Sequence, residues 1–76
     1  MQPATWRVEA NGDLSANIGD LRLVVQAPRD GDPLVHFMLF RRPRVGEEYV
    51  LLASGTEANL QAAKASAVRL AKRSSR

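Results

Sequence analysis

A chain of 76 residues is about half as long as a usual domain, so it predicts a single domain with one hydrophobic core. It contains no cysteine, which excludes disulfides and Cys-based zinc sites as sources of stability. The net charge of +3 is unevenly spread, because residues 1–40 carry three bases and five acids whereas residues 41–76 carry eight bases and three acids.

The first thirty residues contain seven charged side chains and lack the uninterrupted apolar run of a signal peptide. No stretch of the chain is apolar for the length that a membrane span requires. The sequence therefore predicts a cytoplasmic protein that has no membrane partner.

Three segments of the N-terminal half alternate apolar and polar residues with the period of two that is typical of strands. They are residues 5–9, 14–18 and 21–25, and the pairs Asn11-Gly12 and Gly19-Asp20 between them are signals for tight turns. This pattern predicts a three-stranded antiparallel meander.

A loop of turn formers and charged residues at 28–33 precedes the most apolar part of the chain. Residues 34–40 contain only one polar side chain, His36, and are too short for a helix between two prolines, so they predict the central strand. Residues 49–53 predict a fifth strand.

From Ser54 onward the hydrophobic period becomes that of a helix. Ser54 and Glu57 have the spacing of a capping box, and Thr56 is a competing N-cap. On a helical wheel, five apolar side chains form one stripe that we expect to pack against the sheet: Leu60, Ala63, Ala67, Leu70 and Ala71.

The predicted fold is an α+β single domain over residues 1–76. An antiparallel meander of about five strands, residues 5–54, is expected to carry one C-terminal helix, residues 56–72, on one face. Residues 1–4 and 74–76 are expected to be disordered tails.

One helix covers only one face of such a sheet. The period of two assigns to the covered face Trp6, Val8, Leu14, Ile18, Leu23, Val25, Val35, Phe37 and Leu39. Most side chains on the other face are polar, but Val24, Met38 and Phe40 are not, and they predict a contact surface for a second copy or another protein. The alternative is that sheet twist folds this patch over itself or under a loop.

Residues with catalytic or metal-binding chemistry are sparse. The one histidine, His36, lies in the most apolar strand without an evident partner, and Asp30 and Asp32 lack the further oxygen ligands of a calcium loop. No phosphate-binding loop, serine elbow or histidine zinc motif is present. We therefore expect a non-enzymatic protein without metal or cofactor.

Basic residues gather in two places in the C-terminal half. One cluster, Arg41, Arg42 and Arg44, follows the central strand, and the other, Arg69, Lys72 and Arg73, lies near the end of the helix. Either cluster has the chemistry to bind phosphates. The alternative is a solvated charged surface, since basic patches and an arginine bias also arise without a binding function.

The last third of the chain resembles two families in the runs YVLLASGTE (49–57) and AAKASA (62–67). It is similar to the end of a double-stranded RNA-binding domain and to the sheet-plus-helix arm domain of tyrosine recombinases, and both resemblances imply nucleic-acid binding. The first family begins with a helix that this chain lacks, and residues 57–59 replace its lysine-rich helix start, so only Lys64 falls near a base of that family. The resemblance is therefore an analogy of fold.

Two functional hypotheses follow. The first is a small nucleic-acid-binding module that acts through the basic clusters. The second is a protein-interaction or self-associating module that uses the open face of the sheet.

Overall fold

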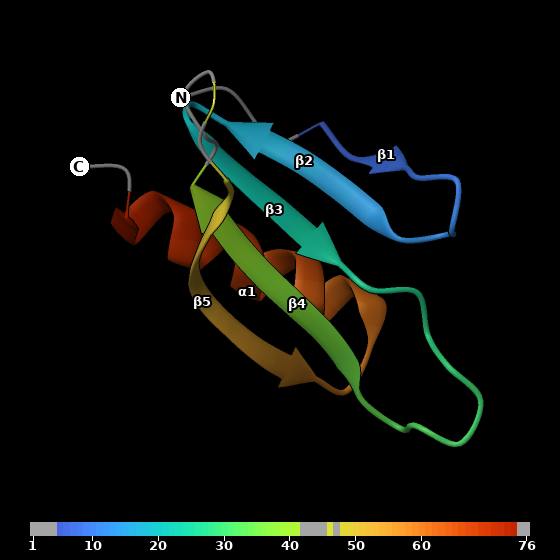
Figure 1. Cartoon of the computed structure of the whole chain (residues 1–76). Helices are drawn as coiled ribbons and strands as arrows, with labels where there is room; N and C mark the ends of the chain where they lie inside the picture. Colours follow the sequence, from blue (N-terminus) through green and yellow to red (C-terminus); the bar gives the residue numbers. More distant parts are fainter. Residues whose placement is uncertain (1–4, 42–45, 47, 75–76) are drawn as a thin grey trace.

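The computed structural model describes residues 5–41, 46 and 48–74. They form five strands and one helix, namely β1 (Arg7–Val8), β2 (Leu14–Ile18), β3 (Leu21–Val25), β4 (Val35–Arg41), β5 (Val50–Glu57) and α1 (Leu60–Ser74) (Figure 1). All neighbouring strands are antiparallel and lie in chain order in one sheet. The predicted α+β meander with a C-terminal helix is confirmed.

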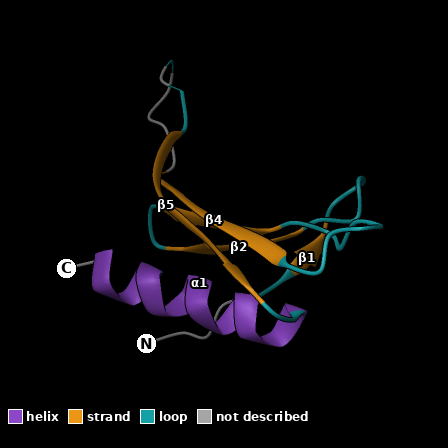
Figure 2. Ribbon diagram, turned by 90° about the horizontal axis from the view of Figure 1, so that it is seen from below, coloured by secondary structure: helices purple, strands orange, loops and turns teal. Residues whose placement is uncertain are grey.

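The molecule has two layers, because α1 lies across one face of the sheet (Figure 2). It packs on β3, β4 and β5 and leaves β1 at the far side of the sheet. The buried apolar residues between the layers are Ala16, Leu21, Leu23, Val25, Val35, Phe37, Leu39, Ala63, Ala67 and Ala71. Alanine is the only helix residue in this set, so the helix approaches the sheet closely.

The predicted division of the sheet into a buried and an open face holds for β3 and β4. It fails in β1, and one predicted core residue of the helix is also exposed. Val8 is 75% exposed, because β1 has only two residues and lies beyond the reach of α1. The prediction that Leu60 is buried was also wrong, because Leu60 is the first residue of α1 and remains 36% exposed. Trp6, Leu14, Ile18 and Leu70 are partly buried around the core.

The start of the helix differs from the prediction. β5 continues through Ser54 and Thr56 to Glu57, and each of these residues pairs with one on β4. The N-cap is Asn59, whose Oδ1 accepts a hydrogen bond of 2.9 Å from the backbone N–H of Ala62. The capping-box interpretation was therefore wrong, because pairing with β4 satisfies the backbone of residues 53–57 in a way that a local motif does not reveal.

We expect Asn59→Ala to lower the free energy of unfolding by about 0.5–2 kcal/mol, because the substitution removes the side chain that caps α1. The matched control is Ser54→Ala, which is expected to change it by no more than about 0.5 kcal/mol at an exposed strand position. Urea unfolding measures both values. A larger loss for Ser54→Ala than for Asn59→Ala would mean that the helix begins earlier than described.

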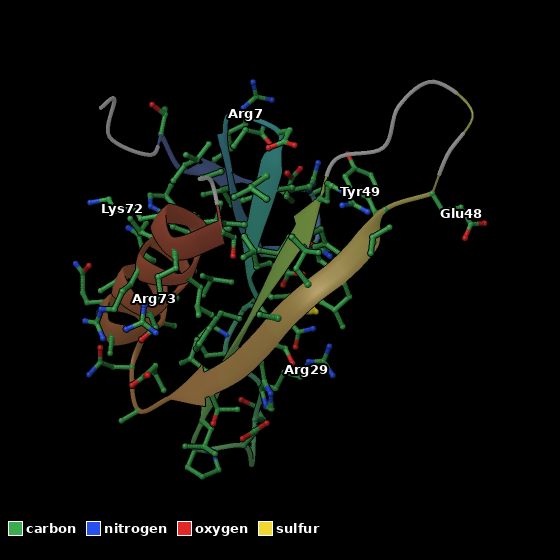
Figure 3. All side chains as sticks on the ribbon, turned by 90° about the vertical axis from the view of Figure 1, so that its left-hand side faces the viewer. Arg7, Arg29, Glu48, Tyr49, Lys72 and Arg73 are labelled. Atoms are coloured by element: carbon green, nitrogen blue, oxygen red, sulfur yellow. The ribbon has the colours of Figure 1, made fainter. Side chains whose placement is uncertain are left out.

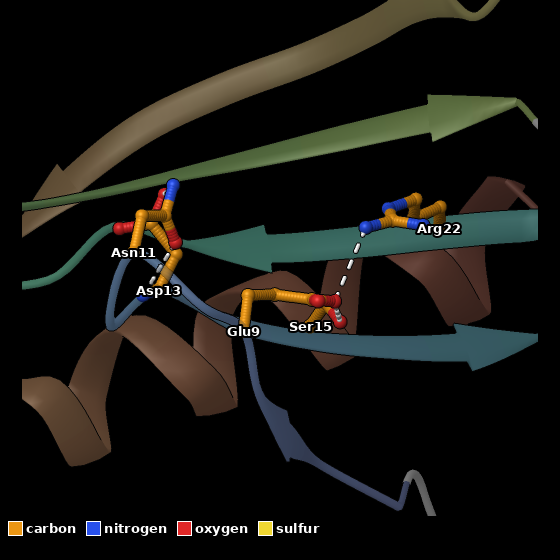
Figure 4. Close-up of polar contacts among 5 residues, drawn as sticks. All are labelled: Glu9, Asn11, Asp13, Ser15 and Arg22. Carbon is orange, nitrogen blue, oxygen red and sulfur yellow. Dashed lines mark hydrogen bonds and ion pairs between the residues drawn. The ribbon is translucent and has the colours of Figure 1, made fainter.

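The turn between β1 and β2 is tied to the rest of the sheet by Asp13 (Figure 4). Its Oδ1 accepts a hydrogen bond of 2.7 Å from the backbone N–H of Ala27, and its own N–H donates to the side chain of Asn11 at 3.0 Å. Gly12 adopts a φ of 91° in this turn, a value that favours glycine. These contacts confirm a turn at Asn11-Gly12 and fix the short strand β1 beside β2.

The expected tails fall mostly outside the described residues, namely 1–4, 75 and 76. Ser74, expected in the C-terminal tail, is instead the last residue of α1. In the described part of the chain, no helix has the length and apolar character that crossing a bilayer demands.

Candidate nucleic-acid interface

The basic residues near the end of α1 divide between two flanks of the helix. Ala63, Ala67 and Ala71 face the sheet, and successive residues of an α-helix are separated by about 100° around its axis. Lys72 therefore lies on one flank of the helix, Arg73 lies on the other, and Arg69 lies between them on the side turned away from the sheet. Figure 3 shows Lys72 and Arg73 projecting from α1, on the opposite side of the sheet from Tyr49.

Lys72 and Arg69 border a groove of about 490 Å³. The groove is lined by Trp6, Gln61, Lys64, Ala65, Val68, Arg69 and Lys72, so one side comes from the segment before β1 and the other from α1. Trp6 is partly buried against the core, which holds its ring in place beside the helix. We call this feature the Trp6 groove.

The Trp6 groove brings an aromatic ring and three bases together. The Nζ atom of Lys64 lies 5.6 Å from the centre of the Trp6 ring, within the range of a cation–π contact. Arg69 is exposed, and Lys64 is half-buried. An indole offers a stacking surface for a planar base, whereas lysine and arginine offer counter-charges for phosphates.

The other predicted basic cluster is only partly described. Arg41 is the exposed last residue of β4, where it pairs with Leu21 and Val50. β4, which ends at Arg41, runs toward the same end of the sheet as α1 (Figure 1). Arg42 and Arg44 lie outside the described residues.

The apolar residues of the open face are less available than the sequence suggests. Val24, Met38 and Phe40 are each half-buried. The ring of Tyr49 meets Phe40 edge-on, with 6.1 Å between the ring centres, and the guanidinium of Arg22 lies 5.7 Å from the centre of the Tyr49 ring. Their use as a contact surface stays a prediction.

A polar network occupies the β1 side of the same face (Figure 4). The carboxylate of Glu9 accepts hydrogen bonds from the hydroxyl of Ser15 and from Arg22, the latter at 3.3 Å. Ser15 is buried and has its partner in Glu9. Because Arg22 also lies over the ring of Tyr49, it connects Glu9, next to β1, with the residue that precedes β5 across this face.

His36 has a partner that the sequence did not reveal, because its Nε2 lies 2.9 Å from Oδ2 of Asp32. The pKa of Asp32 is lowered, first by the backbone N–H of Leu34, which donates to Oδ1, and then by the contact with His36. Both side chains of the pair are exposed to solvent, so the pair is expected to contribute little to stability. Among the residues that the structure describes, no group of three or more potential ligands is placed to hold a metal ion.

Sequence reasoning found two of the bases in the Trp6 groove but missed its aromatic side. Trp6 and Val68 were not related to each other, because about sixty residues separate them and only the packing of α1 brings them together. The one available signal was the lysine at position 64, one turn of helix before Val68 and on the same flank.

Comparison of the chain with known protein families, with curated proteins and with solved structures found no match. The resemblance of residues 49–67 to nucleic-acid-binding domains therefore carries no argument about function.

Proposed function

We propose that the protein is a small non-enzymatic module that binds nucleic acid in the Trp6 groove. The observation that supports this proposal is the convergence of one indole and three bases, Lys64, Arg69 and Lys72, on a single groove. A charged surface that serves only solubility needs no aromatic ring among its bases. A binding surface for nucleic acid uses both kinds of side chain. Lysine and arginine bind the phosphates, and aromatic rings stack against the nucleobases.

Single-stranded nucleic acid is the form that the groove fits best. Stacking on an indole requires a base that is not already paired and stacked within a duplex. The ammonium group of Lys64 lies over the face of the Trp6 ring, so a nucleobase that stacks on this face displaces it toward the neighbouring phosphate. Sequence preference is expected to be slight, because every nucleobase presents a flat face.

Trp6 is the only tryptophan in the chain, so its fluorescence reports directly on the groove. We expect a mixed-sequence single strand to quench this fluorescence at low salt. Binding should weaken as salt is added, with a log–log slope of about −0.7 for each phosphate contact. The double variant Lys64→Ala/Arg69→Ala should bind more weakly and flatten the slope by roughly 1.4, which corresponds to two lost contacts.

The matched control is Arg7→Ala/Arg29→Ala, which removes the same charge from exposed positions outside the groove. We expect the slope of this control to stay close to that of the unmodified protein. Equal slopes for the two double variants would show that net charge alone drives binding. Absence of quenching and of binding at low salt would refute the proposal.

A cytoplasmic location is part of this proposal, because a nucleic-acid partner is met inside the cell.

A further inference from the structure

β5 forms one edge of the sheet, and its outer side has no neighbouring strand among the described residues. It is eight residues long and carries no charge from Val50 to Thr56. The first three residues of β5 and Tyr49 just before it are well exposed, since Tyr49 is 48%, Val50 43%, Leu51 54% and Leu52 41% accessible. A long, uncharged edge with exposed apolar residues is a template for pairing with another strand.

The register shows which backbone groups of β5 are available. In an antiparallel sheet each residue directs its N–H and its C=O to the same neighbouring strand. The C=O of His36 accepts a bond from Gln26 on the β3 side, so the next residue, Phe37, bonds to Gly55 of β5. The N–H and C=O groups of Ser54 and Thr56, which alternate with Gly55, therefore point to the free edge.

The charges near β5 favour a second copy of the same strand in antiparallel orientation. Glu57 closes β5 and lies on the flank of α1 that carries Ser66, whose hydroxyl donates to it at 2.9 Å. Arg73 is seven residues beyond Ser66, so it lies on the same flank two turns later. An acidic group thus stands at one end of the edge and a basic group at the other.

The direction of α1 places Arg73 nearer to the Val50 end of the β5 edge than to the Glu57 end. α1 runs back from Glu57 toward the end of the sheet where β5 begins, although the Val50 end of β5 bends away from the helix (Figures 1 and 2). If two β5 strands pair antiparallel about a centre at Ala53 or Ser54, Glu57 of each copy falls within one residue of Val50 of the other. Glu57 of each copy then lies at the end of the β5 edge that is nearer to Arg73 of the other copy.

We propose that two copies of this chain associate through β5, edge to edge and antiparallel, to form one continuous sheet. The two-fold axis is perpendicular to the sheet, so both α1 helices lie on the same face. The pairing joins the free backbone groups of Ser54 and Thr56 and covers the exposed side chains from Tyr49 to Leu52. The opposite edge is unsuited to this role, because β1 has only two residues.

Sedimentation of the full chain tests this proposal. We expect a reversible rise from 8.3 kDa to twice that mass as the protein concentration increases. Ser54→Pro removes an N–H that points away from β4, a position where a sheet tolerates proline, and it should abolish the dimer while the circular dichroism spectrum is retained. Leu51→Lys is a second variant at an exposed side chain and should have the same effect.

The matched control is Val8→Lys, which places a lysine on the other edge and should leave the dimer intact. Glu57→Lys and Arg73→Glu should each weaken the dimer, and the two substitutions together should restore part of the lost association. A monomer at all concentrations of the unmodified chain would overturn the proposal. So would a dimer that survives in folded Ser54→Pro and in Leu51→Lys. This test does not depend on the Trp6 groove.

Discussion

Replacing Ala67 with glutamine is expected to lower the free energy of unfolding by about 2–6 kcal/mol. Ala67 is completely buried where α1 lies on the sheet, so a longer side chain forces the two layers apart at a typical cost of about 1–3 kcal/mol. The buried amide adds about 1–3 kcal/mol when it lacks a partner. A domain of this length has a total stability of only about 4–11 kcal/mol, so the variant is expected to be close to unfolding at ambient temperature.

The matched control for Ala67→Gln is Ala65→Gln, two residues earlier in α1 and exposed. Both substitutions have the same small effect on helix propensity, so the difference between them isolates burial against the sheet. Thermal and urea unfolding measure this difference. If the two variants lose similar stability, α1 does not present its alanine stripe to the sheet.

The second large effect is expected for Gly55→Ala, which should lower the free energy of unfolding by about 1–3 kcal/mol. A Cβ atom added at position 55 would lie 2.6 Å from Cζ of Phe37, inside van der Waals contact. Phe37 is only 5% exposed and belongs to the hydrophobic core, so a shift of its ring disturbs the packing of its core neighbours.

The effect of Gly55→Ala on stability also shows whether residues 54–57 belong to a strand or to the first turn of a helix. If Gly55 belonged to the first turn of a helix, alanine would be expected to stabilise the protein by about 0.4–1 kcal/mol. In β5, opposite Phe37, it is expected to destabilise. The variant Gly55→Ala/Phe37→Leu should recover part of the loss caused by Gly55→Ala, when compared with Phe37→Leu alone, because the ring that the methyl group meets is then absent. A stabilising effect of Gly55→Ala would contradict the strand.

The sequence predicted the order and type of the elements because the period of two and the period of a helix are local signals. β2, β3 and the turns at Gly12 and Gly19 follow directly from such signals. The boundary between β5 and α1 did not follow. The local capping-box pattern at Ser54 competes with a long-range pairing to β4, and only the folded structure shows which one prevails.

The candidate site was predictable in its charges but not in its shape. Arg69 and Lys72 were identified from the sequence, but their association with Trp6 depends on how α1 crosses the sheet. Arg73 was grouped with them by sequence proximity, whereas the rotation of the helix places it on the flank opposite Lys72, and it does not line the groove. The exposed β5 edge was also missed, because the sequence does not state which strand lies last in the sheet.

Titration of isotopically labelled protein with a mixed-sequence single strand at low salt, followed by NMR, tests the central claim most directly. We expect the indole N–H of Trp6 and the backbone amides of Lys64, Val68 and Arg69 to shift together, and to return toward their original positions as salt is added. The signals of β5, from Val50 to Glu57, should stay unchanged, because that edge lies away from the groove. An absence of shifts, or shifts confined to β5 and Arg41, would contradict the assignment of the Trp6 groove as a nucleic-acid-binding site.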